Sequence, residues 1–281
     1  MKLKKILALG PEGTNGHQAA EGLRPDLKIE FCQHNSEILR GVYEGKAPFG
    51  VVPVENSTTG RINEVIKFWI SLPPNYRNIY VVGGTNLPVR HCLLAHPKIK
   101  QATRLRIVYS HPEALEQCQN SLQRLKLSGQ PSKSTADAVK IVAASEPGQG
   151  LGAIASEFTA GIYGLRILQR DFQDENHNST HFHLIGREKT GRPSGKDLTP
   201  LIFWLKNKPG ELHRATGIFE VANINMVSIH SIPLGRSREF AFYVEIQGHQ
   251  DEEIVASALK LLKNLADRLI VLGSYRPRTI R

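Results

Sequence analysis

The stretch KKILALGPEGTNGHQAAEGL, residues 4–23, joins a short apolar run, a glycine-rich loop and a segment with helical periodicity. An apolar run that stops in such a loop is typical of a buried strand, and the periodicity after the loop favours a helix. The stretch therefore predicts one unit of strand, loop and helix.

The same unit recurs through the first two thirds of the chain. The apolar run FGVVPV (49–54) precedes the loop ENSTTG and the helical pattern RINEVIKFWISL, and RLRIVYS (104–110) and GLGAIAS (150–156) are each followed by a helical pattern. Repeated alternation of strands and helices predicts an α/β domain with largely parallel sheets.

Two of the predicted helices begin with a capping-box spacing, Ser110 with Glu113 and Ser134 with Asp137. In α/β sheets, ligands bind beyond the carboxyl ends of the strands, where helix N-termini converge and favour anions. Several capped helices around one cleft would suit a substrate that carries carboxylates. The alternative, that each cap only stabilises its own helix, stays open at this point.

A second domain follows the polar stretch REKTGRPSGKDLTP (187–200), which lacks periodicity and predicts a linker over 188–199. After it the chain predicts strand, helix, two strands that form a hairpin, helix and strand. That order, βαββαβ, is the ferredoxin-like arrangement. We therefore expect a first domain over 1–187 and a ferredoxin-like domain over 200–281.

The composition limits the partners of the protein. Lys and Arg number 36 against 26 Asp and Glu, an excess of +10 that fits nucleic acid, a membrane surface or a small acidic ligand. The basic residues are scattered and accompany no nucleic-acid motif, and no apolar run reaches the length of a membrane span. The apolar run at the start is shorter than a signal sequence requires, and the three cysteines form no CxxC pair. We expect a cytoplasmic protein with neither nucleic-acid nor membrane partners.

Six short motifs occur in a fixed order: GPEGTNGHQAA, PVENSTTG, VYSHPEALEQC, STADA, GAIAS with YGL, and NSTHF. Together they resemble the prephenate dehydratase family, including its C-terminal ACT regulatory domain. The resemblance implies a carbon–oxygen lyase of phenylalanine biosynthesis that converts prephenate to phenylpyruvate, CO2 and water without cofactor or metal. It also implies a catalytic domain of two α/β lobes, like a periplasmic binding protein, with chain crossovers near 83–90 and 160–168.

The chemistry of that reaction defines the side chains to look for. Prephenate is a dianion, so its cleft needs donors for two carboxylates and a proton donor for the departing ring hydroxyl. The match to the family's motifs makes Thr180 the candidate donor, because a hydroxyl in a closed cleft can stabilise charge on a leaving oxygen. The same match gives the candidate substrate-binding residues Thr14, Asn56, Ser57, Ser134, Thr135, Asn178 and His181.

The chain departs from the family at Asn15 and Gly16, where relatives have Phe-Ser, and at His181, where they have arginine. Alternation along a strand puts His181 on the face opposite Thr180, and its imidazole carries only part of a positive charge near neutral pH. Two alternatives stay open: a prephenate-binding relative with an altered outcome, as a decarboxylase or an arogenate dehydratase, and a catalytically weakened regulatory protein.

A metal site is not expected from the sequence. His181 and His183 would share one strand face with His177 nearby, but no acidic or cysteine ligand lies close to them in the sequence.

The regulatory domain carries the candidate effector site. Residues Gly210, Glu211, Leu212 and His213 align with the family's Gly-Ala-Leu-Val, and His230, Ser231, Ile232 and Pro233 with its Glu-Ser-Arg-Pro. These motifs form the phenylalanine site in relatives, and the bulky polar replacements predict weak binding of phenylalanine. Relatives cover the sheet edge and the apolar face of their ACT domains by pairing the domains side by side, and LIFWL and FAFYVEI supply that apolar content here, so the resemblance implies a homodimer or homotetramer.

Overall fold

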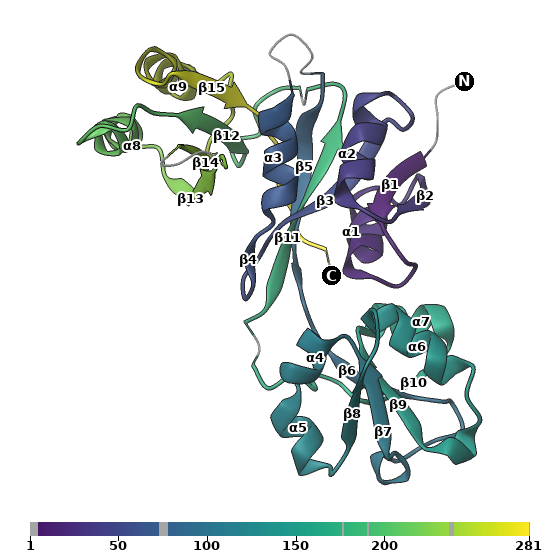
Figure 1. The fold of residues 1–281 in the computed structure, drawn as a ribbon. Helices are drawn as coiled ribbons and strands as arrows, with labels where there is room; N and C mark the ends of the chain where they lie inside the picture. The colour runs from purple at the N-terminus through teal and green to yellow at the C-terminus, as the bar shows by residue number, and fades with distance from the viewer. Residues whose placement is uncertain (1–4, 73–77, 176, 190, 236–238, 281) are drawn as a thin grey trace.

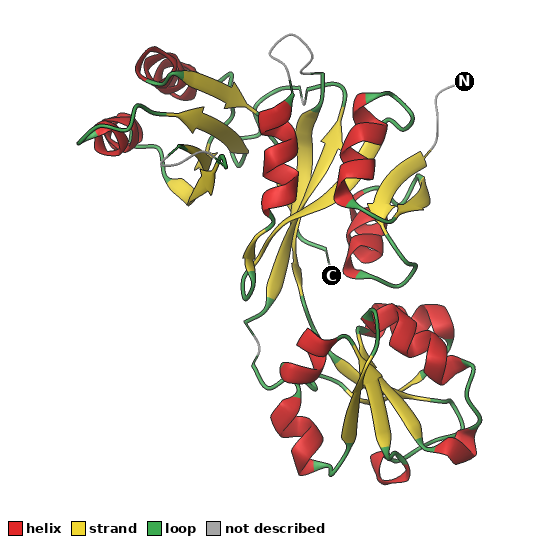
Figure 2. Cartoon of the chain, in the orientation of Figure 1, coloured by secondary structure: helices red, strands yellow, loops and turns green. Residues whose placement is uncertain are grey.

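The structure is a computed structural model that describes residues 5–72, 78–175, 177–189, 191–235 and 239–280. Three bodies are evident in Figure 1: two lobes joined by two chain segments, and a further domain packed against the first lobe. Figure 2 shows that each body has its own sheet and helices. The α/β class with a separate βαββαβ domain is confirmed.

The first lobe is built on a mixed sheet in the order β16-β5-β11-β3-β1-β2, with β4 paired to β3. Its strands are β1 (Lys5–Leu9), β2 (Lys28–Cys32), β3 (Phe49–Asn56), β4 (Gly60–Arg61), β5 (Tyr80–Pro88), β11 (Ser179–Gly186) and β16 (Pro277–Arg278). Its helices are α1 (Asn15–Leu23), α2 (Asn35–Tyr43) and α3 (Asn63–Ser71).

The expectation of largely parallel sheets is correct only in part. Strand β1 is parallel to β2 and β3, but β11 is antiparallel to both β3 and β5. The physical reason is the path of the chain, which leaves the lobe along β5 and returns along β11.

The second lobe has a five-stranded sheet in the order β10-β6-β9-β7-β8. Its strands are β6 (Cys92–Ala95), β7 (Ile107–Ser110), β8 (Ser128–Pro131), β9 (Leu151–Ala155) and β10 (Arg166–Gln169), and its α-helices are α4 (Pro112–Glu116), α5 (Gln119–Arg124), α6 (Thr135–Ala143) and α7 (Glu157–Tyr163). The helix expected after β7 is broken in two, because the Asp174 carboxylate accepts the N–H groups of Asn120 and Ser121 and begins a new helix there.

The crossovers between the lobes differ from the sequence expectation. The first joins β5 to β6 through residues 89–91, at the end of the expected interval. The second joins β10 to β11 through 170–178, not 160–168. Residues 160–168 stay in the second lobe because Gly164, with φ 66°, ends α7 and lets the chain form β10 against β6.

The regulatory domain has the predicted βαββαβ order and the sheet order β13-β14-β12-β15. Its elements are β12 (Leu198–Trp204), α8 (Glu211–Val221), β13 (Met226–Pro233), β14 (Phe240–Gln247), α9 (Glu253–Leu265) and β15 (Arg268–Val271). One face of the sheet packs under the two helices around Phe203 and Phe219. The other face, with Ile202 and Tyr243, shares a core with Trp69 of the first lobe.

Both ends of this domain correct the expected boundaries. Strand β12 begins at Leu198, so the last residues of the expected linker are already strand. After β15 the chain returns to the first lobe, where β16 pairs in parallel with β5. The end of the chain therefore belongs to the catalytic sheet rather than to the regulatory domain. Residues 1–4, and Thr190 within the expected linker, lie outside the described residues.

Within the described ranges, none of the helices combines the length and the apolar character needed to span a bilayer.

Candidate active site

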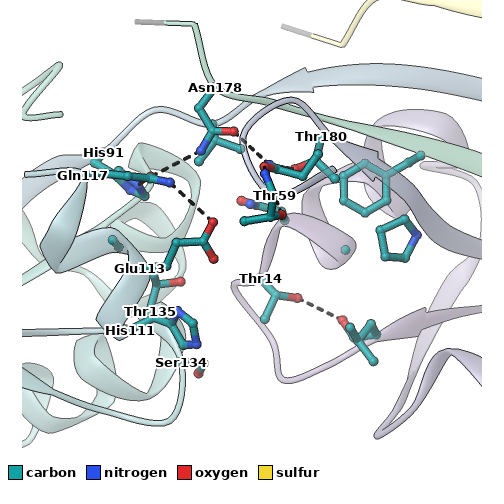
Figure 3. A pocket seen from close by; sticks show the side chains of 18 of the residues that line it. Thr14, Thr59, His91, His111, Glu113, Gln117, Ser134, Thr135, Asn178 and Thr180 are labelled. Atoms are coloured by element: carbon teal, nitrogen blue, oxygen red, sulfur yellow. Dashed lines mark hydrogen bonds between the residues drawn. The ribbon is translucent and has the colours of Figure 1, made fainter. Parts of the chain in front are cut away.

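A cleft of about 370 Å³ lies between the two lobes. Figure 3 shows side chains from both lobes pointing into it. Its lining includes most of the residues predicted from the sequence, namely Thr14, Asn56, Ser134, Thr135, Asn178 and Thr180, and also Asn15 and Gly16. A volume of this size suits a small ring compound.

Thr180 stands near the start of β11 with its side chain in the cleft and only 8% exposed. It lies opposite Asn56 of β3 in the strand register, and the Asn56 Nδ2 donates to Thr180 Oγ1 at 3.0 Å. Because this oxygen already accepts a hydrogen bond, the hydroxyl proton can be directed to a ligand in the cleft.

Asn56 connects three segments around the cleft. Its Nδ2 also donates to Asn178 Oδ1 at 2.8 Å, and its Oδ1 accepts the N–H groups of Thr58 and Thr59, each at 2.9 Å. The amide has both donors and its acceptor in use, so its orientation is fixed. The position of the Thr180 hydroxyl therefore depends directly on Asn56.

Two helix N-termini, one from each lobe, line the cleft. Thr14 is the N-cap of α1, where its Oγ1 accepts from His17 N–H at 3.3 Å and donates to the Leu9 carbonyl at 2.9 Å. Ser134 is the N-cap of α6 and accepts from Asp137 N–H at 3.0 Å, as its spacing predicted. The partial positive charge of these helix ends favours carboxylates between them.

The predicted cap at Ser110 is wrong, and because of it the sequence analysis did not identify Glu113 as a residue of the cleft. Ser110 Oγ donates to the Ile154 carbonyl at 2.7 Å, and the N-cap of α4 is His111. Glu113, free of a capping role, points into the space between the lobes (Figure 3), where its Oε1 is 3.5 Å from Gln117 Nε2. Sequence reasoning assigned Glu113 to a cap, so it missed this carboxylate.

Gln117 and His91 also escaped sequence reasoning. Gln117 Oε1 accepts from Asn178 Nδ2 at 3.2 Å and lies 2.9 Å from His91 Nε2. Burial lowers the pKa of His91, against a smaller opposing effect of its hydrogen bond to Gln117, so its ring is neutral at pH 7. Among the described lining residues there is no Lys or Arg. Anion binding in this cleft must therefore come chiefly from N–H groups, amides and hydroxyls.

The lobes also touch directly at the glycine loop. Thr159 Oγ1 of α7 donates to the Gly13 carbonyl at 2.6 Å, and a Cβ at Gly13, where φ is 87°, would lie 2.8 Å from Thr159 Cγ2. Gly16 is similarly close-packed, since a Cβ there would lie 2.9 Å from the Leu9 carbonyl. The departure from the family's serine at Gly16 thus lets α1 lie close against β1.

Ser57 is not among the residues that line this cleft, but lines an adjoining pocket with Gln117 and Asn178, so its assignment as a substrate-binding residue lacks the support that its neighbour Asn56 has. Its Oγ donates to the His177 carbonyl at 3.0 Å and accepts from Ser179 N–H at 2.9 Å. Both of its hydrogen-bonding functions are thus used to hold the segment that leads into β11.

The assignment of His181 is corrected, because it faces the regulatory domain and not the cleft. Its Nε2 lies 3.0 Å from the hydroxyl of Tyr275. Burial lowers the pKa of His181 to about 4, helped by the charges of His183 and Arg61. The imidazole is therefore neutral at pH 7 and does not replace the charge of the family's arginine. The expected strand alternation, with Thr180 and His181 on opposite faces, is what separates them.

The two effector motifs do not meet around one pocket in a single chain. Glu211 and Leu212 line a small pocket of about 140 Å³ with Phe240 and Phe242, while Gly210 caps α8 with φ 82° and His213 is exposed. In the second motif, Ser231 and Pro233 are exposed, whereas His230 and Ile232 face the first lobe.

Ile232 is thereby corrected as an effector residue. It is only 1% exposed, because it is part of the core between the regulatory domain and the first lobe. The His230 side chain also faces the first lobe, where its Nε2 lies 3.6 Å from Oε1 of Glu55 in β3.

Comparisons with known proteins agree with this architecture. Residues 6–190 match the family model described as prephenate dehydratase, and residues 201–263 match the ACT domain. A bifunctional chorismate mutase/prephenate dehydratase of Aquifex aeolicus is 35% identical over 276 residues, covering 96% of this chain and 73% of the relative. A prephenate dehydratase of Methanocaldococcus jannaschii is 30% identical over 279 residues, covering 97% of this chain and 98% of the relative.

Solved structures show the same fold. The prephenate dehydratase of Arthrobacter aurescens in complex with L-Phe superimposes with a TM-score of 0.84 at 24% identity, covering 97% of this chain and 90% of that chain. The motifs, the two-lobed cleft and the matched family model agree along the chain. This chain is a member of the prephenate dehydratase family with a C-terminal ACT domain.

Proposed function

We propose that the interlobe cleft converts prephenate to phenylpyruvate, CO2 and water, with Thr180 as the donor to the leaving hydroxyl. The observation that carries the proposal is the Thr180 hydroxyl, buried in the cleft and held by the Asn56 amide at 3.0 Å. The carbon–oxygen lyase reaction is also the activity of the family to which the chain belongs.

In the proposed mechanism the two carboxylates of prephenate lie toward the N-termini of α1 and α6. The C–C bond to the ring carboxylate breaks as CO2 leaves, and its electron pair completes the aromatic ring while the C–O bond to the hydroxyl breaks. The Thr180 hydrogen bond strengthens as negative charge grows on that oxygen, which leaves as water after taking up a proton. Solvent replaces the proton, so atoms and charge balance.

The activity is tested by incubating the purified protein with prephenate and following the ultraviolet absorbance of phenylpyruvate. We expect turnover with release of one CO2 for each phenylpyruvate formed. Release of CO2 without the phenylpyruvate signal would show a decarboxylase, and binding without turnover would show a regulatory protein.

The aminated analogue arogenate is a second candidate substrate, and Glu113 is the observation that favours it. Its side-chain ammonium would be attracted to the Glu113 carboxylate, whereas the pyruvyl group of prephenate gains nothing from that charge. A relative from Arabidopsis thaliana named arogenate dehydratase/prephenate dehydratase 2 is 33% identical to this chain over 282 residues.

Exchanging Glu113 for glutamine is expected to raise the ratio of kcat/KM for prephenate over arogenate by about tenfold, because it removes a charge that distinguishes the two. Steady-state kinetics with both substrates measures the ratio. Glu116→Gln, an exposed neighbour on the same helix, is the control. An unchanged ratio in Glu113→Gln would mean that the carboxylate does not contact the substrate side chain.

We also propose that the regulatory domain binds phenylalanine weakly. Support comes from the small pocket at Glu211 and from the separation of the two motifs within one chain. We expect a dissociation constant at least about tenfold above that of a micromolar site, which makes the binding free energy less favourable by about 1.4 kcal/mol or more. Calorimetric titration with phenylalanine measures the affinity, and prephenate turnover at the same concentrations measures the inhibition. Micromolar binding with strong inhibition would contradict the expectation.

A homodimer or dimer of dimers is proposed from the exposed edge of the regulatory sheet. Strand β13 is an edge strand in which Val227 is 48% and Ile229 42% exposed; Phe240, which pairs with Pro233 at the other end of this strand, is 45% exposed. An apolar edge of this kind is commonly covered by a second copy. Light scattering at micromolar concentration should give a dimer or larger, and Ile229→Glu should shift the mass toward a monomer. Ile254→Glu on helix α9 serves as the comparison, and a wild-type monomer would refute the proposal.

A further inference from the structure

A cluster of three possible metal ligands lies where the first lobe meets the regulatory domain. His181 and His183 come from β11, and Glu245 comes from β14; one ligand atom from each lies within 4.8 Å of the other two. The side chains of His183 and Glu245 are 2% and 7% exposed. The structure thus supplies the acidic ligand that the sequence near the histidines lacks.

One atom in this cluster has no partner. His183 Nε2 is buried and, within the described part of the chain, makes no hydrogen bond; the nearest acidic oxygen, Glu245 Oε1, is 3.5 Å away. A buried polar atom without a hydrogen-bond partner destabilises a fold, because the atom has lost its contact with water and gained nothing in return. A cation between the two side chains would give this nitrogen the partner that the protein does not.

The surroundings favour a defined site. The Tyr275 hydroxyl donates to Glu245 Oε1 at 2.8 Å, the same oxygen that lies 3.5 Å from His183 Nε2, so this hydrogen bond holds the carboxylate beside the unpartnered nitrogen. A cavity of about 480 Å³ between the lobe and the regulatory domain is lined by both His181 and Glu245. It provides a route for an ion and space for a water molecule beside it.

We propose that His181, His183 and Glu245 bind a zinc ion that links the catalytic and regulatory domains. Two imidazole nitrogens and one carboxylate oxygen form a donor set typical of zinc, whereas magnesium and calcium prefer oxygen ligands alone. Tyr275 orients the carboxylate, as second partners of metal ligands commonly do. A water molecule from the cavity completes the fourth position.

The test uses the untagged full-length protein, loaded with Zn²⁺, passed over a desalting column and analysed by mass spectrometry for bound metal. We expect about one zinc ion per chain in the wild type and in His34→Gln, and less than about a tenth of that in His183→Gln and Glu245→Gln. His34 is exposed and is not part of the cluster, so it controls for adventitious binding to histidine.

Two further measurements use the wild type and do not depend on the folding of a variant. Loading with Co²⁺ should give the visible absorption of a tetrahedral site, and EDTA should lower Tm by about 5 °C or more. Absence of the Co²⁺ absorption, or equal zinc in wild type and His183→Gln, would overturn the proposal. Loss of zinc from His34→Gln would place the ion elsewhere and would also overturn it. Variants that lower Tm equally with and without EDTA would show a metal-free cluster.

Discussion

Replacing Thr180 with valine is expected to lower kcat for prephenate by at least about a hundredfold, on the order of 3 kcal/mol of activation free energy. Valine keeps the β-branched shape and the packing at the start of β11 but removes the only donor that Thr180 presents to the cleft. KM should change much less, because the lost interaction strengthens in the transition state. Phenylpyruvate formation under saturating prephenate measures the effect.

Thr85→Val is the matched control for that experiment. Thr85 is buried in β5, beside β11, and its Oγ1 has no hydrogen-bond partner among the described residues. Its replacement should therefore leave both turnover and stability nearly unchanged. A Thr180→Val enzyme that retains more than about a tenth of wild-type kcat would exclude Thr180 as the donor.

Changing Asn56 to aspartate is expected to lower kcat/KM by about a thousandfold, on the order of 4 kcal/mol. The substitution keeps the shape but replaces the amide NH2, which donates to Thr180 Oγ1 and Asn178 Oδ1, with a carboxylate oxygen. The carboxylate would accept the Thr180 proton and turn the donor away from the substrate. It would also add a negative charge to a cleft that binds a dianion.

Asn264→Asp, on the exposed face of α9, is the control for adding one negative charge to the protein. That variant should keep wild-type kinetics. If Asn56→Asp lowers kcat/KM by less than about tenfold, the amide does not set the position of the Thr180 hydroxyl.

Local patterns in the sequence account for much of the cleft. The cap at Ser134 follows from the capping-box spacing, and Thr14, Asn178 and Thr180 follow from the resemblance to family motifs. Glu113 could not be found this way, because its spacing from Ser110 fits a cap equally well. The structure decides between the two roles, since Ser110 instead donates across the sheet to Ile154.

The sequence did not predict the contacts between the first lobe and the regulatory domain. Strand alternation correctly put His181 and His183 on one face, but it carries no information about what packs on that face. Glu245 and Tyr275 reach the two histidines through the docking of the regulatory sheet and the return of the chain. The second crossover was misplaced for a similar reason, because β10 pairs with β6, far away in the sequence.

The return of the chain to β5 means that the regulatory domain is anchored at both of its ends. One end follows β11 into β12, and the other passes from β15 to β16. After β16 the chain ends near the first lobe (Figure 1), where Ile280 lies against Gly22 of α1. A domain held at two points can rotate about the line that joins them, but it cannot swing away as a body on a single tether does. The second attachment also contacts α1, the helix whose first turn lines the cleft. Removing the last few residues would therefore remove one of the two attachments and the contact of Ile280 with α1 together, and would leave the shared core around Trp69 and the β11–β12 connection to hold the domain.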